Sequence, residues 1–132
     1  MVIDTSALIA ILLQEPEAMA LMQALVKGEK KVISAFSLLE AKLVIFSRKG
    51  ERGLAELDNL LCLLKIEIID FDKNQVELAC TAWQQFGKGR HVAKLNIGDC
   101  CAYALSKQLK EPLLFKGEDF LKTDVEMVKT TG

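Results

Sequence analysis

The chain opens on Met-Val-Ile-Asp-Thr-Ser-Ala-Leu-Ile-Ala-Ile-Leu-Leu, residues 1–13. Three apolar residues run into an aspartate, and a helical pattern follows at once. We predict a short strand over residues 1–3 and a helix from Thr5 to Leu13, with Asp4 at their junction. A strand that leads directly into a helix is the repeating unit of α/β proteins. The opening stretch therefore favours an α/β fold with Asp4 at the end of a strand.

The same alternation of strands and helices continues through the rest of the chain. The spacing of apolar residues predicts a helix that starts near Pro16, then helices at 36–49, 51–64, 73–86 and 99–110, and strands at 31–34, 66–71, 113–115 and 125–128. No segment has the composition of a linker or a repeat. We therefore predict one α/β domain over residues 1–132, with a central, mostly parallel sheet of five strands covered by helices on both faces.

Composition limits what this domain can be. The 132 residues are 51% hydrophobic and 27% charged, which is typical of one globular domain. The formal net charge is -1, so any nucleic-acid binding has to come from a local basic patch. No signal peptide is visible, and the apolar run 7–13 is too short to cross a bilayer. We expect a soluble cytoplasmic protein that does not bind a membrane.

The cysteines and the histidine argue against a zinc site. The four cysteines form no CxxC pair, and His91 is the only histidine. Three of the cysteines lie in apolar helical patterns and are predicted to be small core residues, which suits a reducing compartment.

Four acidic residues stand where strands end or where helices follow them: Asp4, Glu40, Asp99 and Asp119. In open parallel sheets, ligands bind beyond the carboxyl ends of the strands, so these four side chains could converge. Each has a simpler explanation. Asp4 and Asp99 could cap helices, and Asp119 could be an ordinary turn residue. Glu40 is harder to explain in this way, because Phe36, Leu43 and Val44 surround it on a helix.

A cluster of four carboxylates favours one kind of chemistry. Clustered carboxylates repel and raise one another's pKa values, and a divalent cation removes that conflict. Ligands made only of oxygen select Mg2+ or Mn2+ over zinc. A bound metal activates a water and neutralises charge on a phosphate oxygen, so phosphodiesters can be hydrolysed without a histidine base. The residues therefore predict a metal-dependent phosphodiesterase.

The order of the motifs resembles a known family, the PIN-domain ribonucleases, and in particular the VapC-type toxins of bacterial toxin–antitoxin pairs. The resemblance rests on residues 2–7, on Ser34-Ala35 through Glu40, on the stretch from Gly87 to Cys100, and on residues 114–120. It covers essentially the whole chain. It implies a five-stranded parallel sheet, endoribonuclease activity, a homodimer, and a VapB-type antitoxin that blocks the site. It also implies metal ligands at Asp4, Glu40, Asp99 and Asp119.

Other residues are assigned supporting roles as hypotheses. Asp4 and Asp99 are expected to bind the metal directly, and Glu40 and Asp119 to complete the cluster directly or through water. Thr5 or Ser6 could hydrogen-bond a ligating carboxylate or the scissile phosphate. Asn96 could stabilise the loop before Asp99, or it could equally be an ordinary residue at a helix start. Many relatives carry an amide where this chain has Glu118, and this leaves open whether Glu118 or Asp119 faces the metal. The predicted RNA contacts are Lys88, Arg90, His91, Lys94 and Lys116.

Two other functions remain possible at this stage. A phosphatase would use Asp4 as a covalent nucleophile, but such enzymes typically carry a second aspartate two residues on, where this chain has Ser6. A catalytically silent module that keeps the fold and binds RNA or protein is the other alternative. Trp83 and Tyr103 could stack on bases, although both fit helical core patterns better.

Overall fold

A computed structural model describes residues 1–130, so the last two residues of the predicted domain, 131–132, lie outside the described part. Four parallel strands form one sheet in the order β3-β2-β1-β4, with bounds β1 Val2–Ile3, β2 Val32–Ser34, β3 Glu67–Ile69 and β4 Leu113–Leu114. The expected parallel α/β fold is confirmed.

The prediction of a fifth strand at 125–128 is wrong. In place of a strand, Met127 forms a single parallel bridge to Leu113. The two hydrogen bonds of this bridge run from Leu113 N to Glu126 O and from Val128 N to Leu113 O. Both hydrogen bonds involve the same residue of β4, Leu113, so the segment forms one bridge and no continuous strand pairing.

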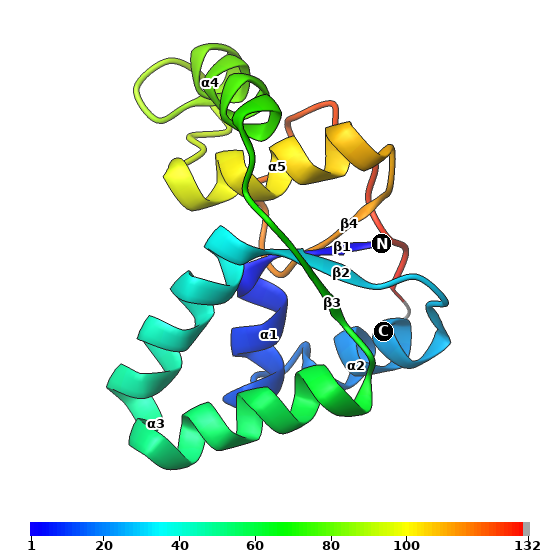
Figure 1. The fold of residues 1–132 in the computed structure, drawn as a ribbon. Coiled ribbons are helices and arrows are strands. Elements are labelled where there is room, and N and C mark those ends of the chain that lie inside the picture. The colour runs from blue at the N-terminus through cyan, green and yellow to red at the C-terminus, as the bar shows by residue number, and fades with distance from the viewer. Residues whose placement is uncertain (131–132) are drawn as a thin grey trace.

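Within residues 1–130, five helices surround the sheet: α1 Thr5–Leu12, α2 Ala18–Lys27, α3 Ala35–Leu63, α4 Lys73–Phe86 and α5 Ile97–Leu109. In α3, Gly50 has φ 64° and ψ -152°, which breaks the helix. Glycine adopts this conformation without a steric penalty. The two helices predicted on either side of Gly50 are therefore present as two arms, which Figure 1 shows meeting at a sharp bend.

The alternation of side chains along the short strands sorts them between two layers of helices. Val2, Val32 and Leu113 pack with α4 and α5, whereas Ile3, Ile33 and Leu114 pack with α1, α2 and α3. Successive residues of a strand point to opposite faces of the sheet. The sheet is therefore covered on both faces as predicted, with α4 and α5 on one side and the other three helices on the other (Figure 1).

The cysteines are less buried than their pattern predicts. Cys100 and Cys101 are buried in α5, but Cys62 and Cys80 are exposed, so two cysteines and not three belong to the core. Of the two exposed thiols, Cys80 lies on the apolar face of α4 beside Val76 and Trp83. None of the helices within residues 1–130 is long and apolar enough to cross a membrane.

Candidate active site

Asp4 follows β1 directly and caps α1. Its Oδ2 accepts hydrogen bonds from the amide of Ser6 at 3.0 Å and from the hydroxyl of Ser6 at 2.6 Å. The side chain is 4% exposed, and this burial raises its pKa to about 6, with further contributions from the charges of Glu40 and Asp119. Helix capping therefore uses only one of the two carboxylate oxygens of Asp4. It does not explain why this carboxylate is buried beside other acids.

Glu40 reaches the same region from the first arm of α3. Its Oε1 accepts a hydrogen bond from Thr5 Oγ1 at 3.0 Å, and this hydroxyl also lies 2.8 Å from the carbonyl oxygen of Ser37. Burial raises the pKa of the half-buried Glu40 carboxyl, and the charge of Asp99 raises it further. Thr5 is thus hydrogen-bonded to Glu40, and its supporting role in the site stays a prediction.

Asp99 is the third residue of α5 and not its first, because the helix begins at Ile97. Asn96 is the capping residue. Its Oδ1 accepts from the amide of Asp99 at 2.9 Å, and Asp99 Oδ2 accepts from the amide of Asn96 at 3.0 Å. This reciprocal capping box fixes the rotamer of Asp99. Burial raises the pKa of Asp99 to about 6, as do the charges of Asp4 and Asp119.

Asp119 lies in the loop after β4 and is exposed, as is Glu118. The charge of Asp119 contributes to the raised pKa values of both Asp4 and Asp99, whereas Glu118 is not among the groups that shift them. Of the two neighbouring acids, Asp119 is therefore the one whose charge acts on Asp4 and Asp99, and its role as a metal ligand stays a prediction. The start of this loop is tied to the site by a 3.0 Å hydrogen bond from the amide of Lys116 to Ser6 Oγ.

Asp4, Glu40 and Asp99 thus lie near the starts of α1, α3 and α5, which begin at one edge of the sheet (Figure 1), and Asp119 lies in the loop after β4. None of the ion pairs formed within residues 1–130 includes any of them. Asp4, Glu40 and Asp99 each accept protein hydrogen bonds through one oxygen only. Three buried or half-buried acids therefore share one region without a basic partner.

These residues fit a hard divalent cation by their chemistry. The donors are oxygens alone, which suits Mg2+ or Mn2+ better than zinc. Among residues 1–130, no three acidic, histidine or cysteine side chains stand close enough to hold a metal ion as they are. Repulsion between like charges favours such a separation. A cation would have to draw the carboxylates together.

The basic residues predicted to touch RNA fall into two groups. Lys88, Arg90 and Lys94 are exposed in the loop between α4 and α5, which leads into the capping box of Asp99. His91 in the same loop is half-buried: its Nδ1 accepts from the amide of Ala93 at 3.0 Å, and its ring meets Phe86 edge-on at 5.1 Å. His91 therefore helps to shape the loop.

Lys116 has a different environment. Its Nζ lies 2.8 Å from Glu15 Oε2 and 3.7 Å from Glu17 Oε2, and these acids raise its pKa. The predicted contact between Lys116 and RNA would require these ion pairs to open.

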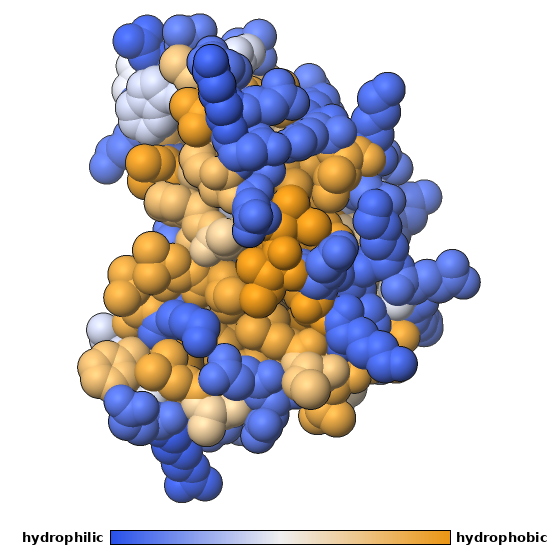
Figure 2. Space-filling view, in the orientation of Figure 1, coloured by the Kyte–Doolittle hydropathy of each residue, from blue (hydrophilic) through white to orange (hydrophobic). Residues whose placement is uncertain are grey.

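An apolar groove beside the acids is a feature that sequence reasoning missed. It encloses about 450 Å³ and is lined mainly by Phe36, Phe71, Val76, Trp83 and Ile97. The interpretation of Trp83 as a core residue is wrong, because its side chain is 38% exposed here. Apolar side chains also gather over the middle of the face shown in Figure 2, between α4 and α3. The helical pattern identified an apolar face of α4 but could not tell whether anything covers it.

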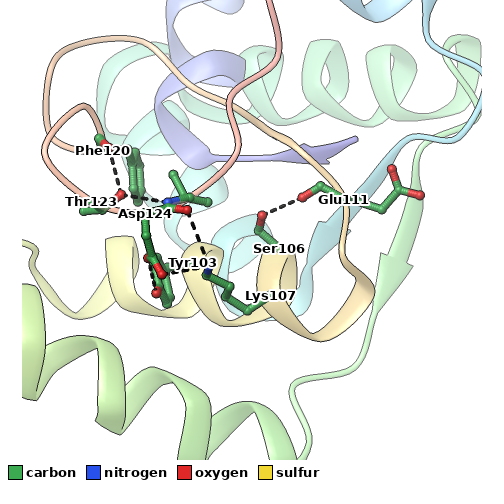
Figure 3. A network of polar contacts seen from close by, with 8 residues as sticks. Tyr103, Ser106, Lys107, Glu111, Phe120, Thr123 and Asp124 are labelled. Atoms are coloured by element: carbon green, nitrogen blue, oxygen red, sulfur yellow. Dashed lines mark hydrogen bonds and ion pairs between the residues drawn. The ribbon is translucent and has the colours of Figure 1, made fainter.

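The polar network around Tyr103 was not predicted either (Figure 3). Tyr103 is buried as expected, and its hydroxyl donates to Asp124 Oδ1 at 2.5 Å, while Lys107 Nζ lies 3.0 Å from Asp124 Oδ2. Thr123 Oγ1 donates to the carbonyl oxygen of Phe120 at 2.7 Å. These bonds anchor the turn that directly follows Asp119 to α5.

Comparisons with known proteins agree with this fold. The family model described as PIN domain matches residues 1–126. The ribonuclease VapC of Mycolicibacterium smegmatis is 48% identical over 128 residues, which cover 97% of this chain and 99% of that protein. An α/β domain with this match is a PIN domain. The chain belongs to the PIN-domain family and, within it, to the VapC group, which confirms the resemblance found in the motifs.

Solved structures share the fold at low sequence identity. VapC20 of Mycobacterium tuberculosis, described as a sarcin–ricin loop cleaving toxin, aligns with a TM-score of 0.80 at 11% identity and covers 98% of both chains. A toxin–antitoxin complex from Klebsiella pneumoniae contains a chain with a TM-score of 0.69 and 18% identity, which covers 93% of this chain and 92% of that one.

Proposed function

We propose that this protein is an endoribonuclease that depends on Mg2+ or Mn2+ and hydrolyses RNA phosphodiester bonds. The observation that carries the proposal is that Asp4, Glu40 and Asp99 share one region, have raised pKa values, and form no ion pair within residues 1–130. Burying such carboxylates close together without a basic partner destabilises the folded protein, and clusters of this kind are typical of functional sites. The ribonuclease named among its relatives supports the same activity.

In this mechanism Asp4 and Asp99 would hold the cation, and Glu40 and Asp119 would complete its surroundings. Three of these acids accept hydrogen bonds in the same way. Ser6 donates to one oxygen of Asp4, Thr5 to one oxygen of Glu40, and the amide of Asn96 to one oxygen of Asp99, which leaves the other oxygen of each carboxylate available to a cation. A divalent cation bound there would lower the pKa of a water molecule and neutralise charge on the scissile phosphate. Once drawn around the cation, the carboxylates would set its position relative to the phosphate.

RNA contacts are assigned to Lys88, Arg90 and Lys94, because these side chains are exposed on the loop that leads to Asp99. Contacts to phosphate give salt-sensitive affinity with little choice of sequence.

We further propose that the protein acts as a toxin in the cytoplasm, forms a homodimer, and is inhibited by a VapB-type antitoxin. The support is membership of the VapC group and the structural neighbour that was solved as a toxin–antitoxin complex. Light scattering of the purified chain tests the homodimer. A short reading frame beside this gene, encoding a protein that co-purifies with the chain and abolishes cleavage, would support the antitoxin.

The activity is tested with purified protein and a structured RNA. We expect cleavage with Mg2+ or Mn2+, none with EDTA, and none with the folded variant Asp99→Asn. Full cleavage in EDTA would contradict the metal mechanism. Release of phosphate from p-nitrophenyl phosphate without RNA cleavage would identify a phosphatase, and RNA binding without cleavage under any metal would identify a silent module.

A further inference from the structure

Gly98 lies in the first turn of α5, directly before Asp99, and it is buried. A Cβ atom added at this position would lie 2.5 Å from Cδ of Glu40, and it would be closer still to both carboxylate oxygens. The carboxylate of Glu40 therefore occupies the space that any side chain at position 98 would need.

The backbone does not explain the glycine. The glycines with positive φ in residues 1–130 are Gly50, Gly89 and Gly117, so Gly98 has a conformation that alanine adopts freely. Alanine is favoured over glycine inside a helix by about 1 kcal/mol. Local helix stability therefore disfavours Gly98, and the remaining explanation is the space it leaves open.

The contact lies on the path by which Glu40 enters the acidic cluster. Glu40 comes from α3, receives one hydrogen bond from Thr5, and its pKa is affected by the charge of Asp99. A methyl group at position 98 would push the carboxylate away from Thr5, Asp99 or both. Because the carboxylate is the far end of a flexible side chain, this displacement needs little rearrangement of the fold.

We propose that Gly98 is a positioning residue, which keeps open the space through which the Glu40 carboxylate joins Asp4 and Asp99 to bind a divalent cation. The proposal rests on the metal-dependent function proposed above. It assigns to Gly98 no contact with RNA or with the cation.

The test is Mn2+ binding to the purified full-length protein without RNA, followed by electron paramagnetic resonance. We expect Gly98→Ala to weaken Mn2+ binding by about tenfold to a hundredfold, as is typical when the support of a metal ligand is removed. Its unfolding temperature in EDTA should not fall. The matched control is Gly53→Ala in α3, where the new Cβ would lie 2.6 Å from Ile45 Cγ2 and from Lys49 Cβ. This control should lower the unfolding temperature and leave Mn2+ binding unchanged.

A double-mutant cycle separates positioning from a general structural effect. Glu40→Gln should weaken Mn2+ binding about tenfold in the natural sequence but less than about threefold in Gly98→Ala, because the carboxylate has already been displaced. Mn2+ binding by Gly98→Ala equal to that of the natural protein, or equal losses from Glu40→Gln in both backgrounds, would overturn the proposal. If the natural protein binds no Mn2+, the proposed function itself fails, and that result is recognised before any variant is compared.

Discussion

Ser6 binds Asp4 twice through the same atom, because its amide and its hydroxyl both donate to Oδ2, at 3.0 and 2.6 Å. The hydroxyl oxygen also accepts the amide of Lys116 at 3.0 Å. One side chain therefore fixes the acid at the end of β1 and the start of the loop that carries Asp119. Ser6 connects two of the four acids, which come from opposite ends of the chain.

Replacing Ser6 by alanine should remove both the short hydrogen bond to Asp4 and the acceptor of the Lys116 amide. We expect RNA cleavage to fall by about tenfold to a hundredfold and the free energy of unfolding to fall by about 1 to 2 kcal/mol. Cleavage rates and urea unfolding measure the two effects. Ser47→Ala is the control, because Ser47 Oγ donates only to Leu43 O on the exposed side of α3. Unchanged cleavage by Ser6→Ala would show that Asp4 keeps its position without this bond.

Asp4→Asn should abolish cleavage and yet stabilise the metal-free protein at pH 7.5. Burial raises the pKa of Asp4 from 3.8 to about 6, so the folded state keeps a proton that the unfolded state loses between those values. Stability from this group is therefore lost as pH rises toward 6, by on the order of 2 to 3 kcal/mol at 1.36 kcal/mol per pKa unit. Asparagine removes this penalty and can still accept from Ser6.

Thermal unfolding in EDTA at pH 5 and pH 7.5 measures this effect. The gain for Asp4→Asn should be larger at pH 7.5, where the natural carboxyl is ionised. Asp58→Asn is the control, because Asp58 is exposed and pairs only with Lys42 at the surface. Lower stability of Asp4→Asn at pH 7.5 would contradict the assigned environment.

Mn2+ binding should depend steeply on pH. Asp4 and Asp99 both have a pKa of about 6, and a cation binds only their ionised forms. Since both protons must leave, we expect affinity at pH 5 to be about a hundredfold weaker than at pH 7. Titration at the two pH values checks this, and equal affinities would show that these acids do not bind the metal together.

Tyr103→Phe should loosen the turn after Asp119 without emptying the core, because the ring remains. We expect the free energy of unfolding to fall by about 1 kcal/mol, the value of one buried hydrogen bond. Partial burial raises the pKa of Asp124, but hydrogen bonds from Tyr103 and Lys107 outweigh it and hold that pKa below its usual value. Stability from this group is therefore present near neutral pH and is lost as pH falls through the lowered pKa. Urea unfolding at pH 7 and pH 3.5 should show a smaller difference between the variant and the natural protein at the lower pH.

The double variant Lys88→Ala, Arg90→Ala should weaken RNA binding without changing Mn2+ binding. For single-stranded RNA, each cationic side chain that binds a phosphate contributes about 0.7 to the slope of log K against log salt, so the double variant should reduce that slope by about 1.4. Binding is measured with Asp4→Asn protein in EDTA, so that no RNA is cut. Arg52→Ala is the control, since Arg52 is 90% exposed on the second arm of α3. An equal effect of Arg52→Ala would mean that RNA binds by general charge.

Much of the fold could be predicted from the sequence because its periodicity is local. Helix α4 begins and ends where its apolar spacing places it, at Lys73 and Phe86. The prediction of a fifth strand was wrong because residues 125–128 have an apolar pattern but lie beside a strand of two residues, β4, and form a single bridge with it. The prediction that Trp83 belongs to the core was wrong for a related reason. A helical pattern identifies an apolar face but does not show whether another element packs against it.

The four acids could be predicted from strand ends and motif order, but their environments could not. Glu40 was singled out for its apolar neighbours along the helix, yet Leu43 and Val44 are 61% and 36% exposed. Its burial comes from Thr5 and Gly98, which are distant in sequence. Likewise, the ion pairs of Lys116 with Glu15 and Glu17 join segments about 100 residues apart, and no local pattern reveals them.

The position of β1 has a consequence for synthesis. This strand precedes the other three strands in the chain, yet it lies inside the sheet, between β2 and β4. During synthesis, Val2 and Ile3 can pair with β4 only after Leu113 and Leu114 have been made. Such long-range pairings form late in folding. Asp119 leaves the ribosome later still. A nascent chain therefore carries an incomplete set of the four acids until residue 119 has been made, so we expect the proposed cleavage activity to appear only after that point in synthesis.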